Sequence, residues 1–280
     1  DGTLEIAIEA DMPQQQSLNI ERLQLVPAGQ DRYILEVTAT KPAVAEQQQP
    51  TQLSAQGRWN VGTGTIAVDG NAKSLILDSR LQDFLAALVP AGAPASSDDL
   101  PGTLARSRLV GQGQLSFRVG REQSGAAWDY KCLLQLTTGT VVIPELSSLP
   151  GLPRHFSSLA GKLYFDARHI QFKQFAGTVA DSRFTINGLI DRGVTPATGQ
   201  LEVTLQNVAL DQRFRGGLPA SWQTMFDTYS LRGHIDVACM LRTTEAGTWQ
   251  PTDSVITARG CSVRHAHFPY PLANITGTLT

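Results

Sequence analysis

Short runs of alternating apolar and polar residues recur along almost the whole chain, and they limit what it can fold into. In residues 183–189, for example, Phe184 and Ile186 alternate with Arg183 and Thr185. Alternation with a period of two is typical of a β-strand that hides one face. Many runs lie about 8–15 residues apart, separated by Gly, Asn, Asp or Pro, whereas parallel strands need crossovers of a dozen or more residues. The pattern therefore predicts antiparallel strands connected in sequence.

The predicted strands cover residues 4–9, 33–38, 65–69, 113–119, 131–136, 140–143, 162–167, 169–172, 183–189, 199–205, 233–241, 255–257, 262–266 and 274–279. Charged residues make up only 17% of the chain, against about 25% in typical globular proteins. The 25 glycines and 15 prolines fit many short strands with turns better than helical bundles. A net charge of −2 without a basic stripe argues against nucleic acid as a partner.

Two segments have the period of a helix instead. Residues 79–89 and 219–229 each place apolar side chains at spacings of three and four, which is typical of a short amphipathic helix. These side chains are Leu81, Phe84, Leu85 and Leu88 in the first segment, and Trp222, Met225, Phe226 and Tyr229 in the second. The aromatic side chains of the second segment could contact a membrane or a ligand, but packing on the chain's own sheet is the favoured interpretation.

A Gly-x-Leu phrase recurs at Gly2, Gly161 and Gly277. We interpret this glycine as a turn that opens a strand. A Leu-Asp-x-Arg corner also occurs twice, at residues 77–81 and 210–214, before each predicted helix. These repeats predict a first β-groove unit at residues 1–160, a second at 161–276 and the start of a third at 277–280. The chain is then expected to be a piece of a larger protein.

No pattern of catalytic or metal-binding residues is strong. His265 and His267, with Cys261 nearby, could hold a metal, but no third ligand lies close in sequence. Asp98 and Asp99 lack the spacing of a calcium loop. We expect no metal, no cofactor and no enzymatic activity.

Two further features bear on chemistry and on location. Glycoside hydrolysis needs two carboxylates at a set distance, and the sequence does not give that distance. A catalytic pair among Asp166, Asp191 and Asp236 therefore stays open. The cysteines, Cys132, Cys239 and Cys261, are odd in number and widely spaced, which argues against a disulfide framework. No run reaches about 18 apolar residues, the length that crosses a membrane as a helix.

Three phrases resemble the AsmA-like family of bacterial envelope proteins: residues 159–172 (LAGKLYFDARHIQF), 182–191 (SRFTINGLID) and 268–279 (FPYPLANITGTL). The resemblance implies a periplasmic protein anchored in the inner membrane through a segment not present here. It implies a long, curled antiparallel sheet whose apolar groove carries phospholipid acyl chains in outer-membrane lipid homeostasis and biogenesis. It implies no catalytic residues.

The strand pattern independently predicts one broad apolar face, because the apolar positions of successive strands can lie side by side. Two short helices cannot cover about fifteen strands, so the sheet must close on a second sheet or curl into a trough. We therefore predict a mainly β fold: a long, twisted, curled antiparallel sheet that forms an apolar groove, with two short amphipathic helices. The candidate groove-lining residues are Leu163, Phe165, Ile170, Phe172, Phe184, Ile186, Leu201, Val203, Leu205, Ile235, Val237 and Leu241.

The leading hypothesis is a non-enzymatic segment that binds or conducts phospholipid or another lipid. The alternative is a tandem β-sandwich module of a secreted protein that acts in adhesion or carbohydrate binding. It predicts two facing sheets, whereas the leading hypothesis predicts one open trough. A β-rich polysaccharide hydrolase is a third hypothesis, and it requires a cleft with two carboxylates about 5–10 Å apart.

Overall fold

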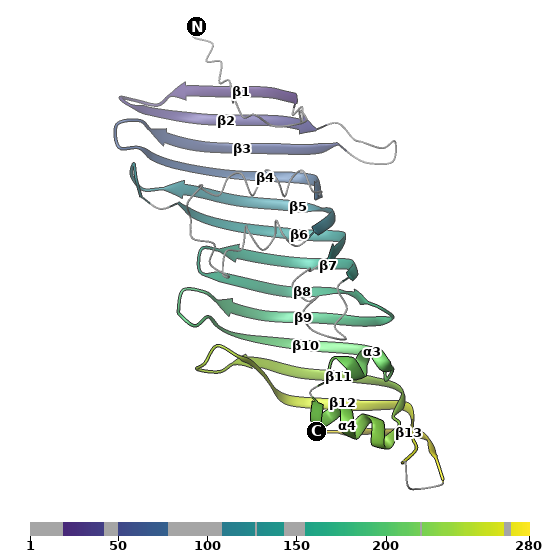
Figure 1. Cartoon of the computed structure of the whole chain (residues 1–280). Coiled ribbons are helices and arrows are strands. Elements are labelled where there is room, and N and C mark those ends of the chain that lie inside the picture. Colours follow the sequence, from purple (N-terminus) through teal and green to yellow (C-terminus); the bar gives the residue numbers. More distant parts are fainter. Residues whose placement is uncertain are drawn as a thin grey trace.

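The computed structural model describes residues 19–41, 50–77, 108–126, 128–142, 155–218, 220–265 and 270–280. In these residues the chain forms one sheet of thirteen strands, β1 to β13, in which every strand pairs antiparallel with the next one along the chain (Figure 1). The sheet is open, because β1 does not pair with β13. The predicted fold class, a mainly β protein with a long antiparallel sheet and short helices, is confirmed.

The strands are β1 Asn19–Pro27, β2 Arg32–Lys41, β3 Thr51–Asn60, β4 Thr65–Leu77, β5 Arg108–Arg121, β6 Asp129–Val142, β7 His155–Asp166, β8 His169–Val179, β9 Ser182–Asp191, β10 Thr198–Ala209, β11 Arg232–Thr243, β12 Trp249–Val263 and β13 Leu272–Leu279. The described helices are α3 Gln212–Gly216 and α4 Ala220–Tyr229, both between β10 and β11. At a strand spacing of about 4.8 Å, thirteen strands make a sheet about 58 Å long.

Most predicted strands lie inside observed ones, but the boundaries differ. Residues 131–136 and 140–143 were predicted as two strands, yet β6 is one strand through residue 142. Likewise β12 joins residues 255–257 to 262–263. In both cases a shift in register interrupts the alternation without ending the strand. The predicted strand at residues 4–9 lies outside the described residues.

Two observed strands, β1 and β3, were not predicted. β3 begins at Thr51, directly after a Gln-rich stretch that carries no strand pattern. The apolar positions of β3 include Ala55 and Gly57, which carry little hydrophobic signal. Pairing with both neighbouring strands gives this segment its structure.

The two long edges of the sheet differ in their connections. Along one edge, which we call the hairpin edge, six short turns join β1 to β2, β3 to β4, β5 to β6, β7 to β8, β9 to β10, and β11 to β12. Most longer connections, including α3 and α4, leave from the opposite edge, which we call the connection edge. Figure 1 shows the hairpin turns on the left and the helices on the right.

At Gly161 and Gly277 the glycine of the Gly-x-Leu phrase does not open a strand, so that interpretation is wrong for these two copies, and Gly2 lies outside the described residues. Gly161 lies within β7, six residues after the strand begins, and Gly277 lies within β13. Gly161 has φ +134°. It faces the bulged part of β8, where a Cβ on Gly161 would lie 2.5 Å from the carbonyl oxygen of Gln174. The glycine therefore gives room to a β-bulge in the next strand.

Bulges occur in several strands and have a common geometry. In most of them, one residue adopts a left-handed conformation, as Gln174 does at φ +49° and Asn207 at φ +60°. The N–H of Gln174 donates to Asn187 (2.6 Å), and that of Asn207 donates to Asp236 (2.9 Å). Side chains of the neighbouring strands thus satisfy the bulged backbone. Bulges bend strands and strengthen their twist, which favours a twisted rather than a flat sheet.

The predicted helix at residues 219–229 is confirmed as α4, and an additional turn of helix, α3, precedes it. The second Leu-Asp-x-Arg corner begins α3: Asp211 is its N-cap and accepts the N–H groups of Arg213 and Phe214. The other predicted helix, at residues 79–89, lies outside the described residues.

The sheet continues through the proposed division between units. The boundary at residues 160 and 161 falls inside β7, so no break in the sheet marks it. The division into repeat units at 1–160, 161–276 and 277–280 stays a prediction from sequence.

Candidate functional site: the apolar face of the sheet

One side of the sheet, which we call the apolar face, is defined by the cross-strand register. It carries Leu163, Phe172, Ile186, Val203 and Val237 together with the residues paired to them on the same side. All twelve candidate groove-lining residues lie on this face: Leu163, Phe165, Ile170, Phe172, Phe184, Ile186, Leu201, Val203, Leu205, Ile235, Val237 and Leu241. Whether they line a lipid groove stays a prediction.

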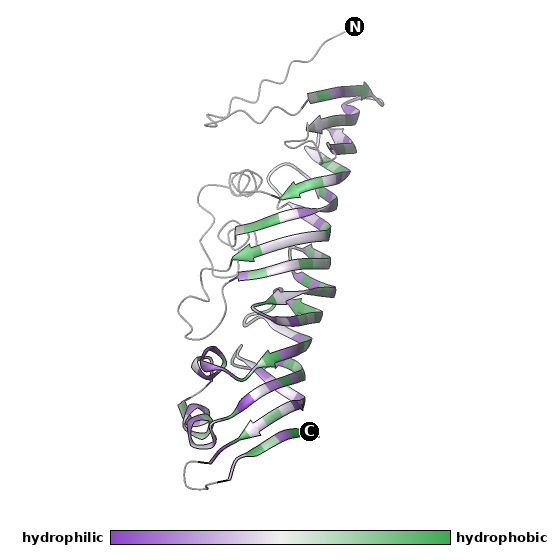
Figure 2. Ribbon diagram, turned by 90° about the vertical axis from the view of Figure 1, so that its right-hand side faces the viewer, coloured by the Kyte–Doolittle hydropathy of each residue, from purple (hydrophilic) through white to green (hydrophobic). Residues whose placement is uncertain are grey.

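The apolar face continues over the remaining strands. Leu163 pairs with Leu134, which pairs in turn with Leu115 and through it with Ala72 and Leu53. The opposite face is polar along the same strands, with residues such as Lys162, Gln171, Arg183, Glu202 and Asp236. Figure 2 shows apolar and polar positions alternating along the strands. Every described strand therefore contributes to one continuous apolar surface.

Charge is nearly absent from the apolar face. Among the paired strand residues whose side chains the structure describes, the register places one charged residue, Arg121, on it. Arg121 ends β5 at the hairpin edge. The interior of the face thus resembles the core of a protein in composition.

Burial divides the apolar face into two halves. In the described residues, nine hydrophobic side chains are buried, and those of the sheet lie toward the connection edge or near the middle of their strands. A packed cluster of Leu77, Leu136, Leu159 and Phe184 forms the centre of this buried half. Two of the twelve candidates, Phe184 and Ile235, are buried, and the other ten are partly exposed. The half toward the hairpin edge is therefore the more open one.

The helices lie at the buried half. Figure 2 shows α3 and α4 on one side of the sheet. Phe226 of α4 is buried and packs against Phe214 of α3, with ring centroids 6.2 Å apart. On the nearby strands, Ile235 and Cys261 of the apolar face are also buried. Of the predicted apolar positions of α4, Trp222, Met225 and Tyr229 remain 41–54% exposed, so only Phe226 packs inward.

Tryptophan side chains lie along the hairpin edge of the apolar face. Trp59, Trp128 and Trp249 are 38%, 49% and 40% exposed. Trp59 contacts the ring of Tyr33, with centroids 6.2 Å apart, and the Trp128 ring lies 5.1 Å from the guanidinium of Arg121. Our sequence analysis missed these residues. Trp59 and Trp249 each lie within three residues of a turn glycine, and that proximity is the signal that could have found them.

All three cysteines lie on the apolar face, and none forms a disulfide. Burial raises the pKa of the Cys132 thiol to about 11 and also raises the pKa of Cys239. The Cys261 thiol donates to the carbonyl oxygen of His234, at 3.2 Å. The raised pKa makes the Cys132 and Cys239 thiols poor nucleophiles, because a nucleophile needs the thiolate.

The raised pKa of Cys132 predicts slow alkylation. With a pKa of about 11 in place of the ordinary 9.0, the thiolate fraction at pH 8 falls about 100-fold. We expect iodoacetamide to label Cys132 about 100-fold more slowly than in the denatured chain, with a rate that rises about tenfold per pH unit up to pH 10. Peptide mass spectrometry measures this rate. A plateau near pH 9 would contradict the prediction.

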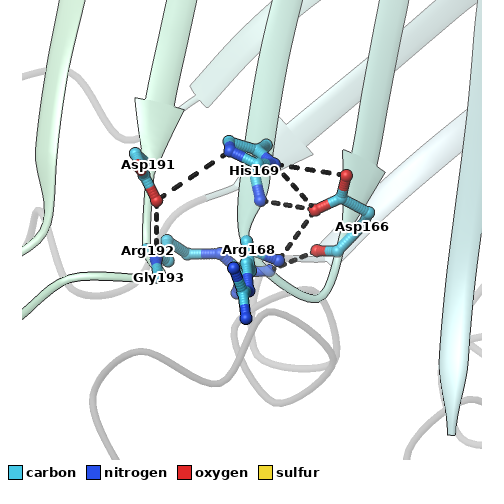
Figure 3. Close-up of polar contacts among 6 residues, drawn as sticks. All are labelled: Asp166, Arg168, His169, Asp191, Arg192 and Gly193. Carbon is cyan, nitrogen blue, oxygen red and sulfur yellow. Dashed lines mark hydrogen bonds and ion pairs between the residues drawn. The ribbon is translucent and has the colours of Figure 1, made fainter.

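A polar cluster joins two hairpin turns at the hairpin edge (Figure 3). The Asp166 carboxylate accepts the backbone N–H groups of Arg168 and His169, each at 2.7 Å. The His169 ring lies between two carboxylates, 3.2 Å from Asp166 and 4.0 Å from Asp191. Partial burial opposes the ionisation of Asp166, but the two N–H groups and His169 outweigh it and lower its pKa.

Arg192 completes the link between the turns. Its N–H donates to the Arg168 carbonyl oxygen at 2.5 Å, and its guanidinium donates to the Asp166 carbonyl oxygen at 2.8 Å. Asp191 accepts the N–H of Gly193 at 2.7 Å within the second turn. The cluster thus fastens the β7–β8 turn to the β9–β10 turn.

Of the three carboxylates considered for hydrolysis, Asp166 and Asp236 have a lowered pKa. Asp166 and Asp191 meet at His169, but Asp236 pairs elsewhere, with Arg259 and the N–H of Asn207. The hydrogen bond from Arg259 lowers the pKa of Asp236, so this group and Asp166 are held ionised. A glycoside hydrolase needs one carboxyl with a raised pKa.

The possible metal ligands are not gathered in the part of the chain that the structure describes. No group of three His, Cys, Asp or Glu residues able to hold a metal occurs there. The His265 ring contacts the Tyr229 ring edge to face, with centroids 5.1 Å apart. His267, Asp98 and Asp99 lie outside the described residues.

Comparisons with known proteins give no relative. No family model matches the chain, and no curated protein or solved structure matches it significantly. Within the described residues, no helix has the length and apolar character needed to cross a membrane.

Proposed function

We propose that the chain is a non-enzymatic, lipid-binding segment whose apolar face holds or conducts the acyl chains of phospholipid or another lipid. One observation carries the proposal: an apolar surface runs across all thirteen strands of an open sheet and remains partly exposed toward the hairpin edge. Soluble monomers rarely expose contiguous apolar patches larger than a few hundred Å². A surface of this kind needs an occupant.

Acyl chains suit this surface better than other apolar occupants. They bind without directional contacts, and each CH₂ group removed from water contributes about 0.8 kcal/mol. The uncharged interior of the face offers hydrocarbon no unpaired polar group to desolvate. The resemblance to AsmA-like proteins supports the same function, with a location in the periplasm and an inner-membrane anchor outside these residues as further parts of the proposal.

The alternative, a tandem β-sandwich module, has less support. It expects strands divided between two facing sheets, whereas the described strands form one open sheet in chain order. A β-rich hydrolase needs a carboxyl with a raised pKa, and Asp166 and Asp236 have lowered ones.

Native mass spectrometry of the purified 280-residue chain tests the proposal. We expect bound phospholipid with the wild-type chain and at least about a tenfold weaker complex after Val203→Glu. The reason is that desolvating a carboxylate against hydrocarbon costs more than the 1.4 kcal/mol that corresponds to a factor of ten. The matched control is Thr204→Glu, which places the same charge on the opposite face of β10.

A second measurement needs no substitution, so it remains valid if Val203→Glu does not fold. Bound lipid should slow the alkylation of Cys132, on the apolar face, at a fixed pH. Absence of lipid from the wild-type chain, or equal losses in both glutamate variants, would contradict the proposal.

A further inference from the structure

The open half of the apolar face ends at the hairpin edge, and tryptophan side chains lie along that edge. Trp59, Trp128 and Trp249 lie on the apolar face within two residues of hairpin turns, and each remains more than a third exposed. The register gives these positions to Trp59 and Trp249. Trp128 is assigned to the apolar face because its ring contacts the guanidinium of Arg121. Arg121 pairs with Ile66 and lies on that face. Three of the chain's four tryptophans thus lie along the hairpin edge of the apolar face.

Tryptophan has a physical reason to lie at such a border. Its ring is large and apolar, and its N–H remains a hydrogen-bond donor, so it is enriched where hydrocarbon meets water. A tryptophan that only completed a protein core would be buried, as Phe184 is at 7% exposure. The hairpin edge therefore has the character of the interfacial region of a membrane.

The dimensions of the sheet fit one orientation of a lipid. A strand of eleven residues, such as β8, is about 36 Å long. One leaflet is half of the hydrocarbon core of a bilayer, about 15 Å, and its acyl chains span that distance. A lipid with its head group at the hairpin edge would place its chains over the open half of the face. The chains would end near the packed cluster of Leu136, Leu159 and Phe184.

Charge favours the same orientation. Arg121, a charged residue that the register places on the apolar face, lies at the hairpin edge beside Trp128. Its guanidinium can face a lipid phosphate without entering the apolar interior. Its partners are the Trp128 ring and the carbonyl oxygen of Gly64, at 3.2 Å, and neither is an anion.

We propose that a phospholipid binds with its head group at the hairpin edge, among Trp59, Trp128, Trp249 and Arg121, and with its acyl chains directed across the open half toward the connection edge. This inference rests on the proposed function, that the apolar face binds lipid, and adds the orientation of the bound lipid.

Fluorescence quenching in single-tryptophan proteins tests the orientation. Each protein keeps one of Trp59, Trp128 and Trp249, with the other tryptophans, including Trp222, changed to Phe. The probes are two phosphatidylcholines with a nitroxide on the head group or near the end of an acyl chain. We expect the head-group probe to quench each tryptophan at least about twofold more strongly, and the reverse order for Leu205→Trp in a chain whose four native tryptophans are Phe.

The outcomes separate the two proposals. Native mass spectrometry that finds lipid, combined with equal or stronger quenching by the chain-end probe at the three tryptophans, would overturn the orientation alone. Absence of both bound lipid and quenching would overturn the proposed function as well. A fluorescence shift with a soluble polysaccharide but not with lipid would overturn both and favour a carbohydrate-binding module.

Discussion

Replacing Gly161 by Ala is expected to lower the free energy of unfolding by about 2–6 kcal/mol. The φ of +134° is a region that residues other than glycine rarely adopt, and such a conformation costs about 1–3 kcal/mol. The new Cβ would also lie 2.5 Å from the Gln174 carbonyl oxygen and 2.6 Å from the Cα of Phe175. Both contacts are with backbone, so β8 must move, and overpacking of this kind costs about a further 1–3 kcal/mol.

Gly277→Ala is the matched control, because it alters the same Gly-x-Leu phrase at the free edge of the sheet. Gly277 has φ +154°, and no atom lies within 4 Å of a Cβ added there. Each strand packs mainly against its neighbours in the sheet, so the loss at Gly161 should be concentrated in β7 and β8. Chemical denaturation measures the total loss in the free energy of unfolding, and amide hydrogen exchange shows which strands lose protection. Equal effects of the two substitutions would refute the role we assign to the glycine.

Leu159→Ala is expected to cost about 2–5 kcal/mol, the range for removing a leucine side chain from a packed core. Leu159 is the most deeply buried large side chain among the described residues, at 1% exposure, and lies in the cluster with Leu77, Leu136 and Phe184. The matched control is Leu189→Ala, because Leu189 is 42% exposed and lies on the opposite face.

Urea denaturation of both leucine variants measures the difference. A cost at Leu159 within about 0.5 kcal/mol of that at Leu189 would show that the cluster contributes no more than an exposed position. It would also mean that the buried half of the apolar face is not a core, and the division of that face into two halves would then fail.

Much of the candidate site could be predicted from the alternation alone. The twelve predicted lining residues all lie on one face, because side chains two apart in a strand point the same way and paired residues share a side. The alternation could not show which of them are covered. Phe184 and Ile235 are buried, whereas Leu163 and Val203 are partly exposed to solvent. This difference in exposure depends on packing at the connection edge.

The tertiary structure also decided what the turns bring together. Asp166, His169, Asp191 and Arg192 come from two separate hairpins, and only the register between neighbouring strands places them in one cluster. The row of tryptophans has the same origin, since Trp59 and Trp249 lie nine strands apart in the sheet order. No spacing along the chain encodes either arrangement.

By itself the sequence determined most of the strands, their antiparallel order and the apolar side of each, because these depend on local alternation and on the length of the connections. The tertiary structure decided that the sheet stays open, that Gly161 gives room to a bulge, and that one half of the apolar face is buried while the other meets water. These features depend on how the backbone of one strand approaches the next and on which segments fold back over the sheet. Such contacts join residues that are distant along the chain, and a local pattern cannot specify them.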